Sequence, residues 1–162
     1  MIYKVQQKIF SFADNFTIKN QYDEDCFIVR GKIFTLGNKL KIEDLQGREL
    51  VYIEQKLFRF LPEYNIYLEG QHLARVKKEF TFLKPRFNIQ SSMGNYKIDG
   101  NFISHNFAIY KGEEIVARID KKFFAFADTY AVDIADTENQ PFMLALVIVI
   151  DQVLHDNNHN NN

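Results

Sequence analysis

The sequence lacks several features that would place it in a particular class of protein. Its 162 residues include no tryptophan, three prolines and a single cysteine, Cys26. One cysteine excludes an intrachain disulfide and a cysteine-based zinc site. The formal net charge of −1 argues against a general nucleic-acid binder, because a basic surface supplies most of the affinity for a phosphate backbone. We therefore expect no nucleic-acid partner.

Long hydrophobic runs and catalytic motifs are also missing. The longest apolar run, Phe142 to Ile150, is shorter than the roughly 20 residues that a membrane-spanning helix needs. The amino-terminal residues lack a continuous apolar stretch followed by a small-residue cleavage site, so we expect no signal peptide and a cytoplasmic protein. No GxSxG, Walker A or GxGxxG pattern occurs in the sequence. We expect neither enzymatic activity nor a bound cofactor.

What the sequence has in quantity is aromatic residues and short alternating segments. Its 16 phenylalanines and 8 tyrosines suit the pleated, half-buried surface of a sheet. Apolar and polar residues alternate at many places, for example from Tyr64 to Leu68 and from Ile115 to Ile119, with glycine-containing turns between such segments. About a dozen candidate strands of this kind predict a sandwich or a barrel.

The chain also repeats itself. The segment GRELVYIEQKLFRFLPEYNI resembles GEEIVARIDKKFFAFADTYAV, and HLARVKKEF is a shorter third copy. Each copy predicts a strand, a glycine turn, a second strand and then an aromatic corner. Repeated units of this kind usually complete one another's core.

The carboxyl-terminal segment breaks the alternation and predicts a helix over about residues 141–155. Pro141 suits the first helical position, and the segment from Phe142 to Leu154 has apolar residues on every face. Such a helix must be buried in protein or in lipid, and its length favours protein. We therefore predict one mainly β domain over residues 1–155, a closed antiparallel barrel of about twelve strands around a buried C-terminal α-helix. Residues 156–162 are predicted to form a polar tail.

Four sequence blocks resemble a known family. They are NKLKIEDLQGRELVYIEQKLFRFLPEYNIY, ARVKKEFTFLKPRFNI, ARIDKKFFAFADTYAVDI and LALVIVIDQVL. Their order is similar to that of the LURP-one-related family, in the Tubby C-terminal-like group, and to its small bacterial members. The resemblance implies a twelve-stranded barrel around a central helix. The same group contains Tubby domains, which bind phosphoinositides, and phospholipid scramblases, which are linked to calcium and membrane lipids.

Basic residues gather between Arg75 and Ile98, and four of them form a candidate site for lipid headgroups: Lys77, Lys78, Lys84 and Arg86. With the resemblance, they predict a non-enzymatic, peripheral binding module for anionic phospholipid or phosphoinositide headgroups at a membrane surface. The alternative is a protein-interaction or regulatory scaffold with no lipid affinity, in which the lysines only keep the outer face of the hairpins solvated. The sequence predicts no particular protein partner.

Acidic residues precede the predicted helix at Asp133, Asp136 and Glu138, where the related scramblases carry a calcium-associated segment. Their oxygens are suitable calcium ligands, but the EF-hand spacing is absent. Carboxylates at this place also complement a helix dipole, so we expect no metal site.

Asp151 interrupts the apolar helix, where an unpaired carboxylate would be costly. One interpretation is a buried acid with a perturbed pKa. The other is a structural anchor that accepts hydrogen bonds or pairs with a basic side chain. We prefer the anchor, because no nucleophile or base can be assigned to it from the sequence.

Overall fold

The computed structural model of the chain describes residues 1–6, 15–32, 37–82, 84–102, 104, 106–120 and 129–156. It contains twelve strands and one helix, in the order β1 (Ile2–Gln6), β2 (Phe16–Asn20), β3 (Asp25–Lys32), β4 (Lys39–Glu43), β5 (Glu49–Gln55), β6 (Glu63–Leu68), β7 (Gln71–Lys78), β8 (Phe87–Ser91), β9 (Tyr96–Asn101), β10 (Asn106–Lys111), β11 (Glu114–Asp120), β12 (Thr129–Ile134) and α1 (Gln140–Asp156).

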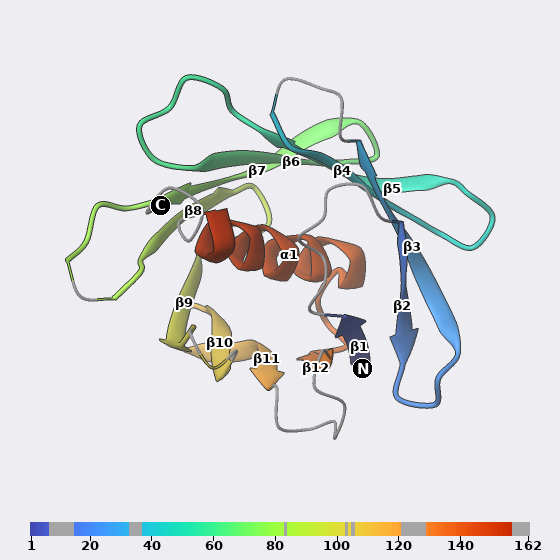
Figure 1. Cartoon of the computed structure of the whole chain (residues 1–162). Coiled ribbons are helices and arrows are strands. Elements are labelled where there is room, and N and C mark those ends of the chain that lie inside the picture. The colour runs from blue at the N-terminus through green and yellow to red at the C-terminus, as the bar shows by residue number, and fades with distance from the viewer. Residues whose placement is uncertain are drawn as a thin grey trace.

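The strands form a closed barrel in which each strand pairs with its neighbours in the chain, and β1 closes the ring against β12 (Figure 1). Every pairing is antiparallel, and β1 and β12 pair from Ile2 opposite Asp133 to Gln6 opposite Thr129. Closure gives every strand a neighbour on both sides, although β8 and β9 pair only at Ile89, which lies opposite Tyr96.

Alternation places one face of each strand inside. In β4 the buried residues are Leu40 and Ile42, and in β5 they are Val51 and Ile53. Leu40 lies opposite Ile53, and Ile42 opposite Val51, so the register brings buried side chains together across the pair. The barrel wall is therefore lined by aliphatic side chains that face α1.

The helix fills the barrel. All nine residues from Phe142 to Ile150 are at most 1% exposed, as expected for a helix that is apolar on every face and surrounded by a sheet (Figure 1). The predicted closed barrel around a C-terminal helix is confirmed. No helix among the described residues is both long and apolar enough to cross a bilayer.

The helix begins one residue earlier than the sequence predicts. The side chain of Asn139 caps it, because its Oδ1 accepts a hydrogen bond from the Phe142 N–H at 2.9 Å. Gln140 is then the first helical residue and Pro141 the second, a position that also needs no backbone donor. The predicted tail, apart from Asp156 at the end of α1, lies outside the described residues.

Candidate functional site

The barrel has two different ends. The connections of residues 56–62 between β5 and β6 and 79–86 between β7 and β8 lie at the end where α1 finishes, which we call the long-loop end (Figure 1). The shorter connections, residues 21–24, 44–48, 69–70, 92–95 and 112–113, lie at the other end, which we call the tight-turn end. This arrangement follows from the topology, since successive turns of an up-and-down barrel alternate between its ends.

The structure brings the four basic residues of the predicted lipid site to the long-loop end. Lys77 and Lys78 end β7, and Lys84 and Arg86 belong to the connection that follows. Lys77, Lys84 and Arg86 are exposed, whereas Lys78 is partly buried, and this burial lowers the pKa of its ammonium group. No ion pair within the described part of the chain involves any of these four side chains.

Basic residues elsewhere on the barrel are mostly neutralised by carboxylates. Arg30 lies 2.6 Å from Glu43, and Lys41 pairs with Glu49 on the neighbouring strand. Even at the long-loop end, Arg59 and Arg75 share the buried carboxylate of Glu63, at 3.7 and 3.5 Å. The predicted site therefore gathers four basic side chains that have no ion pair among the described residues, whereas most other described basic side chains lie beside a carboxylate.

A hollow of about 920 Å³ lies beside these basic residues, between the β7–β8 connection and β9. Three cations line it, Lys84, Arg86 and Lys97, together with the carboxylates of Glu79 and Asp99. The rings of Phe82, Phe87 and Phe102 supply apolar walls. A cavity with apolar walls and a few charged groups can accommodate an amphipathic anion.

Four exposed aromatic residues at the long-loop end were not identified as functional by the sequence analysis. They are Phe58, Phe60, Phe80 and Phe82, which are 99, 92, 66 and 90% exposed. Two of them belong to each connection, with the spacing Phe-x-Phe in both. That spacing, next to Lys and Arg, is the signal from which they could have been found.

The acidic residues before the helix lie at the tight-turn end, where each of them faces a cation of the protein. Asp133 and Asp136 face the amino-terminal ammonium of Met1, at 3.7 and 3.1 Å. Glu138 is buried and accepts hydrogen bonds from the Tyr96 hydroxyl at 2.8 Å and from Lys111 Nζ at 2.9 Å. Across the residues that the structure describes, no group of three or more His, Cys, Asp or Glu side chains could hold a metal ion.

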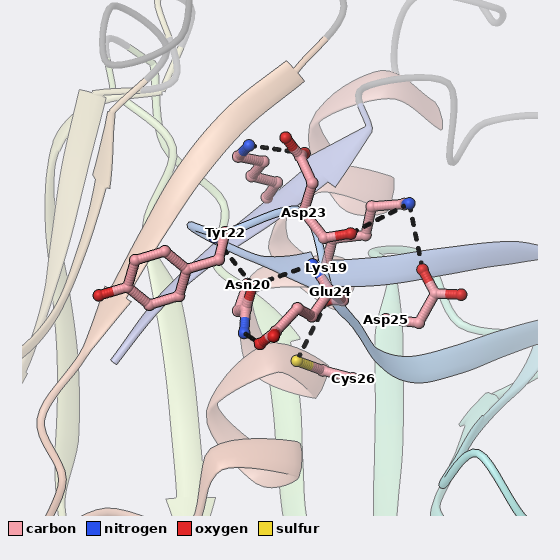
Figure 2. A network of polar contacts seen from close by, with 8 residues as sticks. Lys19, Asn20, Tyr22, Asp23, Glu24, Asp25 and Cys26 are labelled. Carbon is pink, nitrogen blue, oxygen red and sulfur yellow. Dashed lines mark hydrogen bonds and ion pairs between the residues drawn. The ribbon is translucent and has the colours of Figure 1, made fainter.

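The turn between β2 and β3 shows the same internal pairing at the tight-turn end (Figure 2). Lys4 Nζ lies 2.6 Å from Asp23 Oδ1, and Lys19 Nζ lies 3.2 Å from Asp25 Oδ1. The side-chain oxygen of Asn20 accepts hydrogen bonds from the N–H groups of Tyr22 and Glu24.

Cys26 follows this turn at the start of β3. Burial raises the pKa of its thiol, and the neighbouring carboxylates of Glu24 and Asp25 add to the shift. The thiolate is therefore disfavoured, which agrees with the absence of an activating neighbour in the sequence.

Asp151 lies inside the barrel, towards the long-loop end. The residue is 2% exposed, and its Oδ2 accepts a hydrogen bond from the Tyr130 hydroxyl of β12 at 3.5 Å. Burial and the nearby carboxylate both raise the pKa of Tyr130, so the phenol stays protonated and can donate. The contact is of the kind that an anchor between helix and wall requires.

Known proteins resemble this chain over most of its length. Residues 1–151 match the LURP-one-related family. An uncharacterized protein of Bacillus subtilis, YxjI, is 38% identical over 151 residues, which cover 93% of this chain and 92% of that protein. Protein LURP-one-related 15 of Arabidopsis thaliana is 21% identical over 92% of this chain and 78% of its own length.

The fold also has a counterpart among solved structures. An X-ray structure of an Arabidopsis thaliana protein superimposes with a TM-score of 0.67 and 18% sequence identity. The match covers 94% of this chain and 91% of that protein, so it includes the barrel and its helix. The chain belongs to the LURP-one-related family.

Proposed function

We propose that the protein is a non-enzymatic binding module whose long-loop end docks peripherally on an anionic phospholipid surface, such as the cytoplasmic leaflet of a membrane. The observation that carries the proposal is the gathering of Lys77, Lys78, Lys84 and Arg86 at one end of the barrel, where none of them forms an ion pair with another described residue. Positive charge that no carboxylate of the described residues neutralises is available to an anionic partner outside the protein.

The distribution of the remaining charges supports a fixed orientation on the surface. The tight-turn end presents Asp23, Asp25 and Asp136, whose cationic partners belong to the protein itself. An anionic surface attracts the long-loop end and has little net attraction for the opposite end. The hollow beside Lys84, Arg86 and Lys97 provides a place for one phosphorylated headgroup.

Co-sedimentation with liposomes tests the proposal. Vesicles that contain phosphatidylglycerol are expected to carry the protein into the pellet, and pure phosphatidylcholine vesicles are not. Each basic residue near an anionic surface contributes about 1 kcal/mol, so replacing the four residues with glutamine is expected to weaken partitioning by about two to three orders of magnitude. The matched control replaces four basic residues outside the long-loop end, with the same loss of charge: Lys19, Arg30, Lys41 and Arg48.

The outcomes separate the proposal from its alternative. If neither kind of vesicle sediments the protein, the lipid function is wrong, and a protein-interaction or regulatory scaffold becomes the better hypothesis. If both quadruple variants lose binding equally, net charge rather than the long-loop end is responsible. The measurement is repeated with calcium, and we expect no change, because Asp133, Asp136 and Glu138 already face cationic groups of the protein.

A further inference from the structure

The most unusual surface of the molecule is formed by the exposed rings of Phe58, Phe60, Phe80 and Phe82, which we call the aromatic tips. Single exposed apolar residues are ordinary, but four large exposed aromatic side chains on two neighbouring connections are not, and concentrations of exposed apolar surface mark interaction sites. The barrel interior does not need these rings, since α1 and the inward residues of the strands already fill it.

The two connections that carry the aromatic tips are joined at their bases. Strands β6 and β7 pair with each other, and the Lys78 N–H donates to the carbonyl oxygen of Pro62 at 3.0 Å, which joins the bases of the two connections. In Figure 1 both connections extend beyond the wall on the side where α1 ends.

The backbone holds the rings outward instead of folding them onto the barrel. Phe58 adopts φ 57°, a left-handed conformation that bulky residues rarely take. Phe80 and Phe82 pack edge to face against each other, with ring centroids 5.1 Å apart and planes at 85°. Both connections are therefore organised so that their aromatic side chains face solvent.

The charges around the rings indicate which partner they contact. Arg59 lies between Phe58 and Phe60, and Lys84 and Arg86 follow Phe82, while Glu79 is the only acidic residue in the two connections. Protein–protein interfaces are depleted of lysine around their aromatic cores. Proteins that lie on a membrane combine aromatic residues at the boundary of the acyl chains with lysine and arginine at the level of the headgroups.

We propose that the aromatic tips insert into the acyl boundary of an anionic bilayer while the neighbouring basic side chains contact the headgroups. This inference rests on the proposed function. It adds a hydrophobic contribution to the membrane affinity and specifies how deeply the protein enters the bilayer. Binding by charge alone would disappear at high salt, because the Debye length falls to about 3 Å at 1 M. Binding with inserted aromatic tips is expected to persist in part.

The absence of native tryptophan makes insertion directly measurable. Phe60→Trp and Phe82→Trp each replace one of the aromatic tips with a fluorescent tryptophan. Tyr22→Trp places a tryptophan at the tight-turn end, where Tyr22 is 74% exposed. Vesicles of phosphatidylglycerol and phosphatidylcholine with brominated acyl chains quench a tryptophan that reaches the acyl region. We expect quenching and a blue shift for Phe60→Trp and Phe82→Trp, and neither for Tyr22→Trp.

A second set of variants measures the contribution to binding. Replacing Phe58, Phe60, Phe80 and Phe82 with serine is expected to leave the melting temperature unchanged, because the rings are exposed, and to weaken partitioning at high salt by about a hundredfold. Tyr22→Ser is the control at the opposite end, with no expected loss.

Each result decides between the proposals. Sedimentation with anionic vesicles but no quenching of Phe60→Trp or Phe82→Trp overturns insertion and leaves the proposed function standing. No sedimentation at all overturns both. Equal quenching of all three reporters also overturns the proposal, since it would show that no particular end of the barrel enters the bilayer. Self-association of the unmodified protein that the four serine substitutions abolish would show that the aromatic tips bind a second copy instead.

Discussion

At the tight-turn end of the barrel, carboxylates and cations lie in pairs within single turns or between neighbouring strands, as for Lys4 with Asp23 and Lys19 with Asp25. At the long-loop end, Lys77, Lys84 and Arg86 are exposed and form no ion pair with another described residue, and four phenylalanine rings are exposed beside them. The same barrel architecture supports both ends, so the difference comes from the connections rather than from the wall. The charged groups of the tight-turn end are mostly paired with one another, whereas the long-loop end combines the paired Arg59 and Arg75 with exposed basic side chains that pair with no other described residue.

The largest expected effect is a loss of stability on truncating a buried side chain of α1, the helix that runs between the two ends of the barrel. Leu146 lies in the middle of α1 and is fully buried, so Leu146→Ala should lower the free energy of unfolding by about 2–5 kcal/mol. Denaturation with urea measures this loss. Leu57→Ala, at a residue that is 38% exposed in the long-loop end, is the control and should cost far less. Similar costs for both variants would mean that the helix does not hold the barrel together.

The next largest loss of stability is expected from removing an ion pair at the tight-turn end. Lys111 pairs with the buried carboxylate of Glu138 at 2.9 Å, and its ammonium also lies 5.5 Å from the centre of the Tyr96 ring. Removing it with Lys111→Met should lower stability by about 1–3 kcal/mol, less than for a fully buried pair, because Lys111 is partly exposed. Adding Glu138→Gln to this variant should restore part of the loss, and vesicle binding should stay unchanged.

A smaller loss of stability is expected from removing either of two hydrogen bonds that join the barrel wall to the helix or to the residues just before it. Each end has a tyrosine–carboxylate hydrogen bond, Tyr96 to Glu138 at 2.8 Å and Tyr130 to Asp151 at 3.5 Å. Each Tyr→Phe variant should cost about 1 kcal/mol, and the shorter bond should cost more. Thermal unfolding of the two variants side by side tests the order. Asp151→Leu adds a direct check, since unchanged or higher stability would show that Asp151 is not a necessary anchor.

The smallest expected effect is a change in stability at Lys78, a residue of the long-loop end whose replacement should affect stability and vesicle binding in opposite directions. Partial burial lowers the pKa of Lys78, so the folded protein binds its proton less tightly than the unfolded chain does. Stability should therefore rise as the pH increases through the lowered pKa towards the unfolded one. Lys78→Met should raise stability at neutral pH by up to about 0.5 kcal/mol yet weaken vesicle binding. Exposed Lys77, changed to Met, should weaken binding without the gain in stability.

The barrel and its helix could be predicted because both follow from periodicity. Alternation in segments such as Tyr64 to Leu68 specifies a strand, and the all-round apolar surface of Phe142 to Ile150 specifies a helix that something must surround. The start of the helix was missed by one residue, because the cap depends on where the Asn139 side chain points.

The aromatic tips could not be recognised in the same way. A phenylalanine in a β sequence is expected inside, and the repeats suggested only that each unit ends in an aromatic corner. Phe60 and Phe82 face solvent because their connections lie at an end of the barrel, outside a core that other side chains already fill. That arrangement is visible only in the folded structure. The sequence also does not show how differently the acidic residues before the helix are placed: Asp133 is exposed on β12, whereas Glu138 is buried.

The position of α1 after every strand has a consequence for how the chain is made. A ribosome produces the whole wall of the barrel before the segment that fills it, so the aliphatic lining has no permanent partner until residues 140–156 appear. Neighbouring hairpins can form early because their contacts are local, whereas pairing of β1 with β12 and capture of the helix join distant parts of the chain. We expect nascent chains that stop before Gln140 to be aggregation-prone and to depend on chaperones.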